Sequence, residues 1–454
     1  MPYLSLNPAT GKVLQQFASL DRSALPEILQ QVALAQQRWA PLSFAERASY
    51  LHAIADALLA NKDNYAQLMT LEMGKLRREA VAEIEKSALV CRFYADNAAQ
   101  QLAPEVIASD ASHSYVRFEP LGVLLGVMPW NYPFWQVFRY VAPALMAGNG
   151  CVLKHASNVP QCALAVEQVC RDAGLPENLF RTLLIKSRDV EAVLASPHVQ
   201  AVTLTGSEAA GRQVAALAGQ NLKKSVLELG GSDPFIVLAD ADLDWAVAQA
   251  IPARFTNAGQ SCISAKRLIV VPQIAAAFVA RLQAAMALLQ PGDPDLDETT
   301  LAPLARVDLR DELHQQVQDS ISAGARPLLG CQVPDGPGAF YPASLLDRVA
   351  PGQRAYTEEI FGPVALVLRA ADENDAIRIA NDTRFGLGSS VWSRDIARAE
   401  AIAARIETGN CYINSLVRSD PRLPFGGIKA SGYGRELSAY GIREFVNLKT
   451  VWVR

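Results

Sequence analysis

The sequence carries little charge and no basic block. Only 19% of its 454 residues are Asp, Glu, Lys or Arg, against about a quarter in an ordinary soluble domain, and the formal net charge is −4. Such a chain has no electrostatic attraction for a nucleic acid or an anionic membrane, so we expect neither as a partner. Because 50% of the residues are hydrophobic, we expect large buried cores and burial at a subunit interface, in a homodimer or homotetramer.

Cysteines at metal or redox spacing are also missing. The seven cysteines are scattered over Cys91, Cys151, Cys162, Cys170, Cys262, Cys331 and Cys411. They form no C-x-x-C motif and no Cys/His cluster, so we expect no metal site and predict free thiols in a reducing cytoplasm. The beginning of the chain lacks the basic and apolar regions of a signal peptide, and Arg281 and Gln283 interrupt the longest apolar stretch. We therefore expect a cytoplasmic protein without a membrane anchor.

The pattern along the chain predicts an α/β protein. Residues 25–98 have apolar residues at helical spacing, and residues 113–129 read as a strand, a turn and a buried strand. Strand and helix patterns then alternate over residues 150–228, which is typical of a doubly wound parallel sheet. A second such series follows over residues 234–414. No linker of low complexity separates the two, so we expect closely packed domains around a shared crevice.

Two residues could carry covalent chemistry. Cys262 follows a polar Gly-Gln-Ser loop, and Glu228 ends an apolar run before two glycines. A thiolate is a nucleophile, and a carboxylate can take a proton from water in a second, hydrolytic step. A lone cysteine is more often a small buried apolar residue and a lone glutamate a solvated charge. The flanking residues of both positions favour the catalytic interpretation.

A second set of residues could bind a nucleotide. Gly206 and Ser207 follow a predicted strand and begin a helix, where free backbone N–H groups and the helix dipole can hold a pyrophosphate. The spacing is not G-x-G-x-x-G, and a simple turn with a helix cap is the alternative. Lys154 ends a neighbouring strand of the same predicted sheet, at the edge where such sheets bind ligands. Together these positions favour a nucleotide site.

Three further segments are weak signals by themselves. Asn131 lies in a turn between Pro129 and Pro133 and could donate a hydrogen bond to an oxyanion, although a turn asparagine usually satisfies its own backbone. The segment from Glu358 to Pro363 could equally be a helix end. The glycine-rich segment 424–436 could be a surface connector.

Taken together, these motifs resemble the aldehyde dehydrogenase superfamily, over nearly the whole chain and in the order of that family. The resemblance implies an NAD(P)-binding domain of the Rossmann type, a second α/β domain that carries the cysteine, and a small β arm for oligomerisation. The expected limits are residues 1–104 and 122–229 for the NAD(P)-binding domain, 230–423 for the catalytic domain, and 105–121 and 424–454 for the arm.

The resemblance also implies a role for each matching residue. Cys262 is the expected nucleophile, Glu228 the general base, and Asn131 with the backbone N–H of Cys262 the oxyanion hole. The expected contacts to NAD or NADP are Trp130, Lys154, Ser157, Gly206, Ser207, Leu229, Glu359 and Phe361. The implied reaction is oxidation of an aldehyde through a thiohemiacetal and a thioester, which water attacks. Relatives that pass the acyl group to coenzyme A generally lack the glutamate, so Glu228 argues for hydrolysis.

Three segments, residues 129–137, 152–156 and 226–235, are most similar to bacterial succinate-semialdehyde dehydrogenases. In that group an arginine matching Arg139 binds the substrate carboxylate, and Ser419 is a second expected contact, although Arg139 could instead be a surface or interface residue. One departure is Thr256, where many relatives have a second arginine. We expect succinate semialdehyde as substrate, with glutarate semialdehyde or another short aldehyde as the alternative. Arg418 and Arg422, near Ser419, are candidates for the missing charge.

Two other departures concern the cofactor and redox control. Ser157 stands where NAD-selective relatives often have a glutamate that repels the 2′-phosphate of NADP, so we expect both NAD and NADP to be used. Ser264 stands where some relatives have a second cysteine, so a regulatory disulfide with Cys262 is not expected, and oxidation would lead to sulfenic acid or a thiol cap.

Two other classes of protein stay open on the sequence. A cysteine hydrolase without nucleotide would need a histidine partner for Cys262. The histidines are His52, His113, His155, His198 and His314. They lie outside the motifs above, apart from His155 beside Lys154. A structural or binding oligomer that has lost its chemistry would not need Cys262, Glu228 and Asn131.

Overall fold

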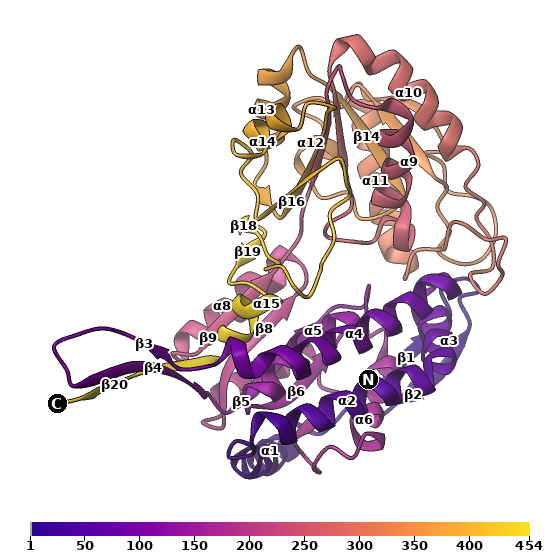
Figure 1. Cartoon of the computed structure of the whole chain (residues 1–454). Helices are drawn as coiled ribbons and strands as arrows, with labels where there is room; N and C mark the ends of the chain where they lie inside the picture. The colour runs from indigo at the N-terminus through magenta and orange to yellow at the C-terminus, as the bar shows by residue number, and fades with distance from the viewer. Residues whose placement is uncertain (1) are drawn as a thin grey trace.

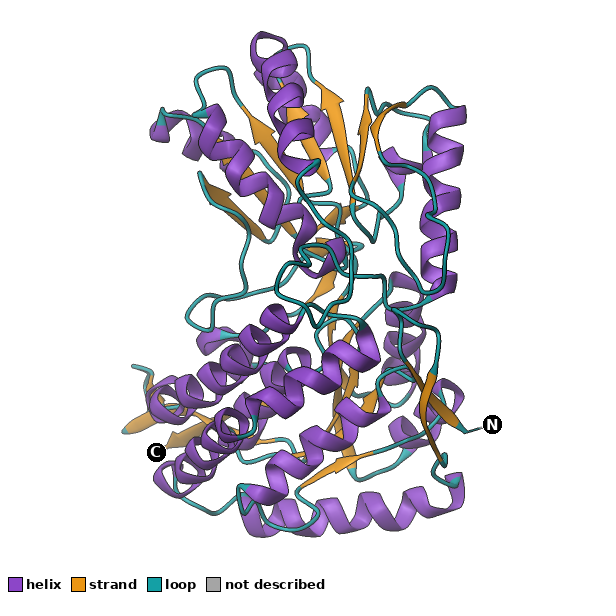
Figure 2. Cartoon of the chain, turned by 90° about the vertical axis from the view of Figure 1, so that its right-hand side faces the viewer, coloured by secondary structure: helices purple, strands orange, loops and turns teal. Residues whose placement is uncertain are grey.

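Two mostly parallel β-sheets, each with helices packed against it, make up most of the chain (Figure 1). The structure is a computed structural model that describes residues 2–454. Figure 2 shows mainly loops where the two halves meet. Within residues 2–454 no helix is long and apolar enough to cross a membrane.

The first sheet is parallel except at one edge. Its strands, in spatial order, are β19 (Gly432–Tyr433), β9 (Lys224–Glu228), β8 (Val199–Thr205), β5 (Val123–Met128), β6 (Gly150–His155) and β7 (Phe180–Thr182). Only β19 runs antiparallel to its neighbour, β9. Because the other strands run in one direction, their carboxyl ends lie along one edge, where Met128, His155, Thr205 and Glu228 are the last residues.

Helices cover both faces of this sheet. They are α1 (Leu25–Trp39), α2 (Phe44–Ala60), α3 (Lys62–Met73), α4 (Arg77–Gln101), α5 (Trp135–Met146), α6 (Pro160–Asp172), α7 (Val190–Ala195) and α8 (Glu208–Gln220). Side chains alternate along a strand, and in β5 Leu124 joins the core beneath α2, α4 and α5, whereas Val123 and Leu125 join the core beneath α1 and α7. Both faces are thus buried, which explains the continuous apolar runs of the sequence.

Local signals set the ends of these helices. Ser43 and Glu46 form a capping box at the start of α2, and Ser207 caps α8 by accepting a hydrogen bond from the backbone N–H of Ala210. Gly74 ends α3 in the left-handed conformation, with a φ of 81°. The N-terminal chain adds a hairpin of β1 (Tyr3–Leu6) and β2 (Val13–Phe17).

The second sheet has the same construction. Its strands, in spatial order, are β12 (Arg326–Leu329), β13 (Ser344–Asp347), β14 (Val364–Arg369), β11 (Arg267–Val270), β10 (Pro234–Val237), β16 (Gly388–Trp392) and β17 (Asn410–Ile413). Only β12 is antiparallel to its neighbour. The helices of this half are α9 (Leu243–Phe255), α10 (Pro272–Met286), α11 (Val307–Ser322), α12 (Arg354–Thr357), α13 (Glu373–Asn381) and α14 (Ile396–Ala403). The α/β prediction is confirmed for both halves.

A three-stranded antiparallel sheet extends from the first half (Figure 1). It consists of β3 (Glu105–Val106), β4 (His113–Pro120) and β20 (Val446–Val453), and β20 pairs with β4 over its full length. The segment 424–445 does not share this sheet. Within it β18 (Ile428–Lys429) pairs with β15 (Phe385–Gly386), β19 pairs with β9, and α15 (Ser438–Arg443) contacts α4 and α5. The domain limits given above stay a prediction.

Most elements expected from the sequence are present. The strand and turn pattern of residues 113–129 corresponds to β4 and β5, and the expected helix 373–381 corresponds to α13. The pair β12 and β13 was not predicted. β12 is short, contains Pro327 and is not fully buried, so neither alternation nor an apolar run marks it.

Candidate active site

Cys262 lies on a loop between the two halves of the molecule. The loop follows a short helical turn, Thr256–Gly259, in which Asn257 and Ala258 have φ values of 57° and 53°. The side chain of Asn257 stabilises this left-handed backbone, because its Nδ2 donates to the carbonyls of Asn131 at 2.9 Å and Gln260 at 3.1 Å. The turn therefore ties the cysteine loop to the Pro129–Pro133 turn of the first half.

The surroundings of Cys262 favour its protonated thiol. Burial raises its pKa to about 12, an effect that the positive charges of Lys266 and Arg139 oppose. Lys266 Nζ donates to the carbonyl oxygens of Ser261 and Cys262, both at 2.8 Å. A thiolate is the reactive form, so a nucleophilic role requires removal of the thiol proton.

Asn131 has the free donor that an oxyanion hole needs. Its side chain is nearly buried, and Nδ2 donates one hydrogen to the Gln260 carbonyl at 3.0 Å. An amide nitrogen has two hydrogens, which leaves one for a ligand. Its backbone carbonyl accepts from Lys75 Nζ at 2.9 Å, which fixes the turn in place. The structure thus brings Asn131 and Cys262 to the wall of one cavity.

We call this first cavity the nucleotide cavity; its volume is about 250 Å³. The lining residues are Pro129, Trp130, Asn131, Gln136, Thr205, Gly206, Ser207, Leu229, Gly230, Cys262, Leu309, Glu359 and Phe361. Lys266 Nζ and the backbone N–H of Gly231 hold the Glu359 carboxylate, at 3.0 and 3.1 Å. Phe361 meets Trp130 edge to face, with ring centroids 5.8 Å apart. Six of the eight expected cofactor residues therefore lie together, and Leu309 is a member that no motif indicated.

The other two expected cofactor residues line a separate cavity of about 440 Å³ near the same sheet edge. Its lining residues are Pro2, Tyr3, Leu4, Lys154, Ser157, Asn158, Ile185, Lys186 and Ser187. No carboxylate is among them, within the described part of the chain. Lys154 is almost fully buried, and burial lowers the pKa of its ammonium.

Together these features fit a dinucleotide. The N-terminus of α8 and its cap Ser207 lie at the end of β8, and the backbone N–H of Gly206 donates to the Glu228 carbonyl at 3.0 Å, which fixes the turn. A side chain at Gly230 would meet the Glu359 carboxylate and displace it from its present position. Because Gly206 and Gly230 have no side chains, a ligand can approach the backbone of these two turns closely.

Glu228 lies behind the cavity wall. Its side chain is 2% exposed, neither carboxylate oxygen has a hydrogen-bond partner among the described residues, and it lines neither cavity that holds Cys262. Burial, followed by the negative charge of Glu436, raises its pKa well above 4.5, while Arg139 and Arg435 oppose this. Burial thus favours the neutral form of Glu228 in this conformation, and its carboxyl lines neither cavity at the thiol, so its role as a base stays a prediction.

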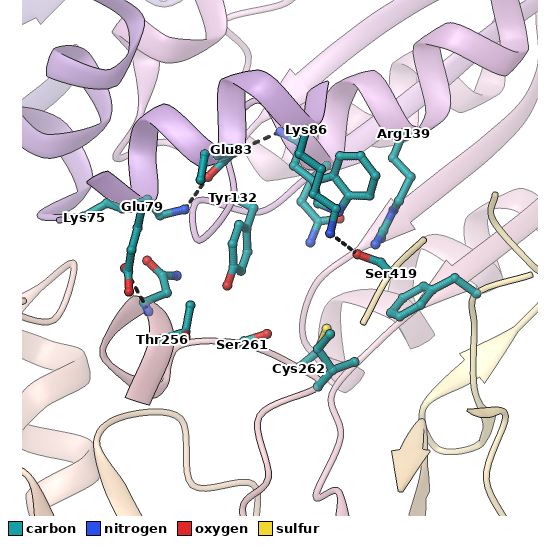
Figure 3. A pocket seen from close by; sticks show the side chains of 16 residues that line it. Lys75, Glu79, Glu83, Lys86, Tyr132, Arg139, Thr256, Ser261, Cys262 and Ser419 are labelled. Atoms are coloured by element: carbon teal, nitrogen blue, oxygen red, sulfur yellow. Dashed lines mark hydrogen bonds and ion pairs between the residues drawn. The ribbon is translucent and has the colours of Figure 1, made fainter. Parts of the chain in front are cut away.

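The second cavity that reaches Cys262, of about 240 Å³, is here called the aldehyde cavity (Figure 3). It is lined by Lys75, Glu79, Ala82, Glu83, Lys86, Tyr132, Trp135, Gln136, Arg139, Thr256, Asn257, Ser261, Cys262, Ile263, Ser419 and Phe425. The expected substrate residues Arg139 and Ser419 are both present, as is Thr256. Arg139 is 2% exposed, its guanidinium forms an ion pair with Glu436, and it lies over the Phe425 ring.

The charged residues of α4 in this cavity were not predicted. Glu79, Glu83 and Lys86 follow one another at helical spacing on α4, and that pattern is the signal that could have placed them on one inward face. Arg422 does not join them, since it is exposed and pairs with Asp420 at 2.6 Å. Arg418 lines a neighbouring cavity instead. That cavity shares Lys86, Thr256 and Ser419 with the aldehyde cavity, so a role of Arg418 as the missing charge stays a prediction.

Comparison with known proteins is consistent with this geometry. The model of the aldehyde dehydrogenase family matches residues 2–451. The chain belongs to the aldehyde dehydrogenase family. It is 50% identical to succinate-semialdehyde dehydrogenase (NADP(+)) 1 of Mycobacterium ulcerans over 457 residues, with 100% of both chains covered. It is 51% identical to a Synechocystis protein named as a probable enzyme of the same kind, again over the full length of both.

Solved structures agree with the aldehyde dehydrogenase fold. The succinic semialdehyde dehydrogenase of Streptococcus pyogenes in complex with NADP+ has a TM-score of 0.98 and 38% identity, with 99% of each chain covered. PnpE of Pseudomonas sp. WBC-3, in complex with nicotinamide adenine dinucleotide, has a TM-score of 0.96 and 31% identity, with 100% of this chain and 94% of that chain covered. The predicted family and fold are thus confirmed, and the chain is an oxidoreductase of this family.

Proposed function

We propose that this aldehyde dehydrogenase oxidises succinate semialdehyde to succinate, with NADP or NAD as the oxidant. The observation that carries the proposal is the position of Cys262 between two cavities, one of which is lined by six of the expected cofactor residues and the other of which contains buried cations. The names of the relatives at 50% and 51% identity support the same substrate.

In the first step the thiol of Cys262 releases its proton to solvent, and the resulting thiolate attacks the aldehyde carbon. The free Nδ2 hydrogen of Asn131 and the backbone N–H of Cys262 hold the oxyanion of the resulting thiohemiacetal. Such preorganised donors contribute about 3 to 4 kcal/mol each to transition-state stabilisation. A bound nicotinamide supplies the chemistry that no side chain provides, which is acceptance of a hydride.

In the second step the acyl group on Cys262 is hydrolysed. Glu228 is the proposed base, which takes a proton from the attacking water. To do so it has to be ionised and to turn from its buried position toward the thioester. Its unpaired carboxylate oxygens support such a movement, because no hydrogen bond has to break.

The proposed cofactor range follows from the cavity around Lys154 and Ser157. Ser157 brings no negative charge against a 2′-phosphate, and Lys154 provides a buried cation. We therefore expect both nucleotides to be used. A ratio of catalytic efficiencies above about a thousand, or roughly 4 kcal/mol, would contradict this.

The proposed substrate follows from the aldehyde cavity, in which Arg139 and Ser419 are candidate contacts for a carboxylate. Glutarate semialdehyde is the alternative, because the same groups would meet a chain that is one carbon longer.

We also propose that the protein is a cytoplasmic homodimer or homotetramer. Exposed apolar residues on the arm, Val106, Leu448 and Trp452, support assembly through this sheet.

The test is the initial rate at which reduced nucleotide forms from succinate semialdehyde with NAD or NADP. We expect turnover with both, and a loss of at least about a thousandfold in Cys262→Ala. Cys331→Ala is the matched control, since Cys331 is buried and lines no cavity that contains Cys262. Equal rates in the wild type and Cys262→Ala would refute the mechanism. Turnover of other aldehydes only would refute the substrate.

A further inference from the structure

The aldehyde cavity contains several charges, and most of them are already neutralised. Lys75 pairs with Glu83 inside the protein, and Arg139 pairs with Glu436. The Glu83 carboxylate also accepts hydrogen bonds from the backbone N–H groups of residues 134 and 135, at 2.9 and 3.0 Å. Groups that are paired in this way have little attraction left for a further ion.

Two charged residues of the cavity lack an ion pair among the described residues, Glu79 and Lys86. Glu79 accepts a hydrogen bond from the backbone N–H of Asn257 at 3.0 Å, and burial raises the pKa of its carboxyl, which favours the neutral form.

Lys86 is the cation of these two residues. Its ammonium donates to Ser419 Oγ at 2.7 Å and lies 4.3 Å from the centre of the Trp135 ring, and within residues 2–454 no carboxylate is within ion-pair distance. Figure 3 shows this ammonium and Ser419 in contact at the cavity, opposite the loop of Cys262. A partly buried cation without a counterion is costly, and an anionic ligand relieves that cost.

We propose that Lys86 and Ser419 bind the carboxylate of the semialdehyde, so that Lys86 provides the charge that Thr256 lacks. This inference rests on the proposed function, whose substrate it explains. The Ser419 hydroxyl accepts from Lys86, and its own hydrogen remains free to donate. Lys86 has two further N–H groups. A carboxylate, which only accepts hydrogen bonds, matches this set of donors.

Electrostatics supports the assignment. Burial lowers the pKa of the Lys86 ammonium to about 8, and the positive charges of Arg139 and Arg418 act in the same direction. Glu83 and Asp420 oppose them, but both are engaged in ion pairs, with Lys75 and Arg422. A bound carboxylate would stabilise the charged ammonium, so binding and protonation of Lys86 are coupled.

The experiment compares kcat/KM for succinate semialdehyde with kcat/KM for butanal, its uncharged counterpart. In Lys86→Met we expect this ratio to fall by about 10- to 100-fold, with butanal oxidation retained. Lys86→Arg should keep most of the preference. Lys62→Met is the matched control, because it removes a surface lysine that pairs with Glu85, the neighbour of Lys86. An unchanged ratio in Lys86→Met would overturn the assignment.

The wild-type enzyme provides a second test, which does not depend on whether a Lys86 variant folds. Burial lowers the pKa of Lys86 to about 8, so its charge should be lost progressively as pH rises through this value. We therefore expect KM for succinate semialdehyde to rise with pH while KM for butanal does not follow. A ratio of the two KM values that stays flat across this range would overturn the role of Lys86. Failure of the proposed function would look different, because the wild type itself would then show no preference for the semialdehyde over butanal.

Discussion

The two cavities that meet at Cys262 are built in different ways. The nucleotide cavity is lined by turns directly after strands, as at Trp130, Gly206 and Leu229, and much of what it offers is backbone. The aldehyde cavity is lined by long charged side chains from α4 and α5, among them Lys86 and Arg139. Recognition by the backbone suits a nucleotide that a whole family shares. Recognition by side chains allows the preference for one aldehyde over another to change through a few substitutions.

Among the predictions that compare the two cavities, Glu228→Gln should have the largest effect. It tests whether Glu228, which lies behind the wall of the nucleotide cavity, acts on the thioester at Cys262. We expect kcat to fall by about 10²- to 10⁴-fold, because the amide cannot take a proton from water. One equivalent of reduced nucleotide should still form rapidly, since the thioester then accumulates on Cys262. Stopped-flow absorbance measures both phases.

The same variant should be more stable than the wild type at neutral pH. Burial raises the pKa of Glu228 above 4.5, so the folded state binds its proton more tightly than the unfolded state. The stability due to this proton is full below the ordinary pKa and declines as pH rises through the folded value. Glu105→Gln is the control, because Glu105 is exposed, pairs with Arg443 and is not among the charges that shift the pKa of Glu228. In the stopped-flow experiment, slow formation of the first equivalent of reduced nucleotide by Glu228→Gln would contradict a role of Glu228 limited to hydrolysis.

The same contrast explains which parts could be predicted from the sequence. Strands that end at one edge of a parallel sheet place the following residues together, so Gly206 and Ser207 could be placed at this edge from order alone, whereas Leu229 was expected only from the family resemblance. Lys86 could not be assigned, because a lysine on an amphipathic helix is usually solvated. Its environment comes from Ser419, which is distant in the chain and adjacent only after folding. The raised pKa of Glu228 likewise depends on burial and on Glu436, which is distant in the chain.

Arg139 and Lys86 are cations of the same cavity that should respond differently to removal. Arg139→Met leaves the buried carboxylate of Glu436 without its partner, which we expect to cost about 3 to 5 kcal/mol of folding free energy. Lys86→Met breaks no ion pair, and we expect a smaller loss. Denaturant unfolding of both variants measures the difference.

Two further measurements separate the structural effect of Arg139 from substrate binding. The double variant Arg139→Met with Glu436→Gln should regain much of the lost stability, since no buried charge is then left unpaired. If Arg139 also contacts the substrate, Arg139→Met should raise KM for succinate semialdehyde far more than for butanal. Equal increases for both aldehydes would assign Arg139 to the structure of the cavity alone.

Ser157→Glu tests the nucleotide side of the comparison and should have the smallest effect. A carboxylate at this position would repel a 2′-phosphate, and we expect kcat/KM for NADP to fall by about 10- to 100-fold while the value for NAD changes little. The control is Gln168→Glu, which adds the same charge on the exposed face of α6. A parallel loss with both nucleotides would mean that the substitution disturbs the cavity wall, and the 2′-phosphate would then have to lie elsewhere. A loss confined to NADP would instead show that one side chain at a turn sets the nucleotide preference, just as Lys86 on a helix is proposed to set the preference for the aldehyde.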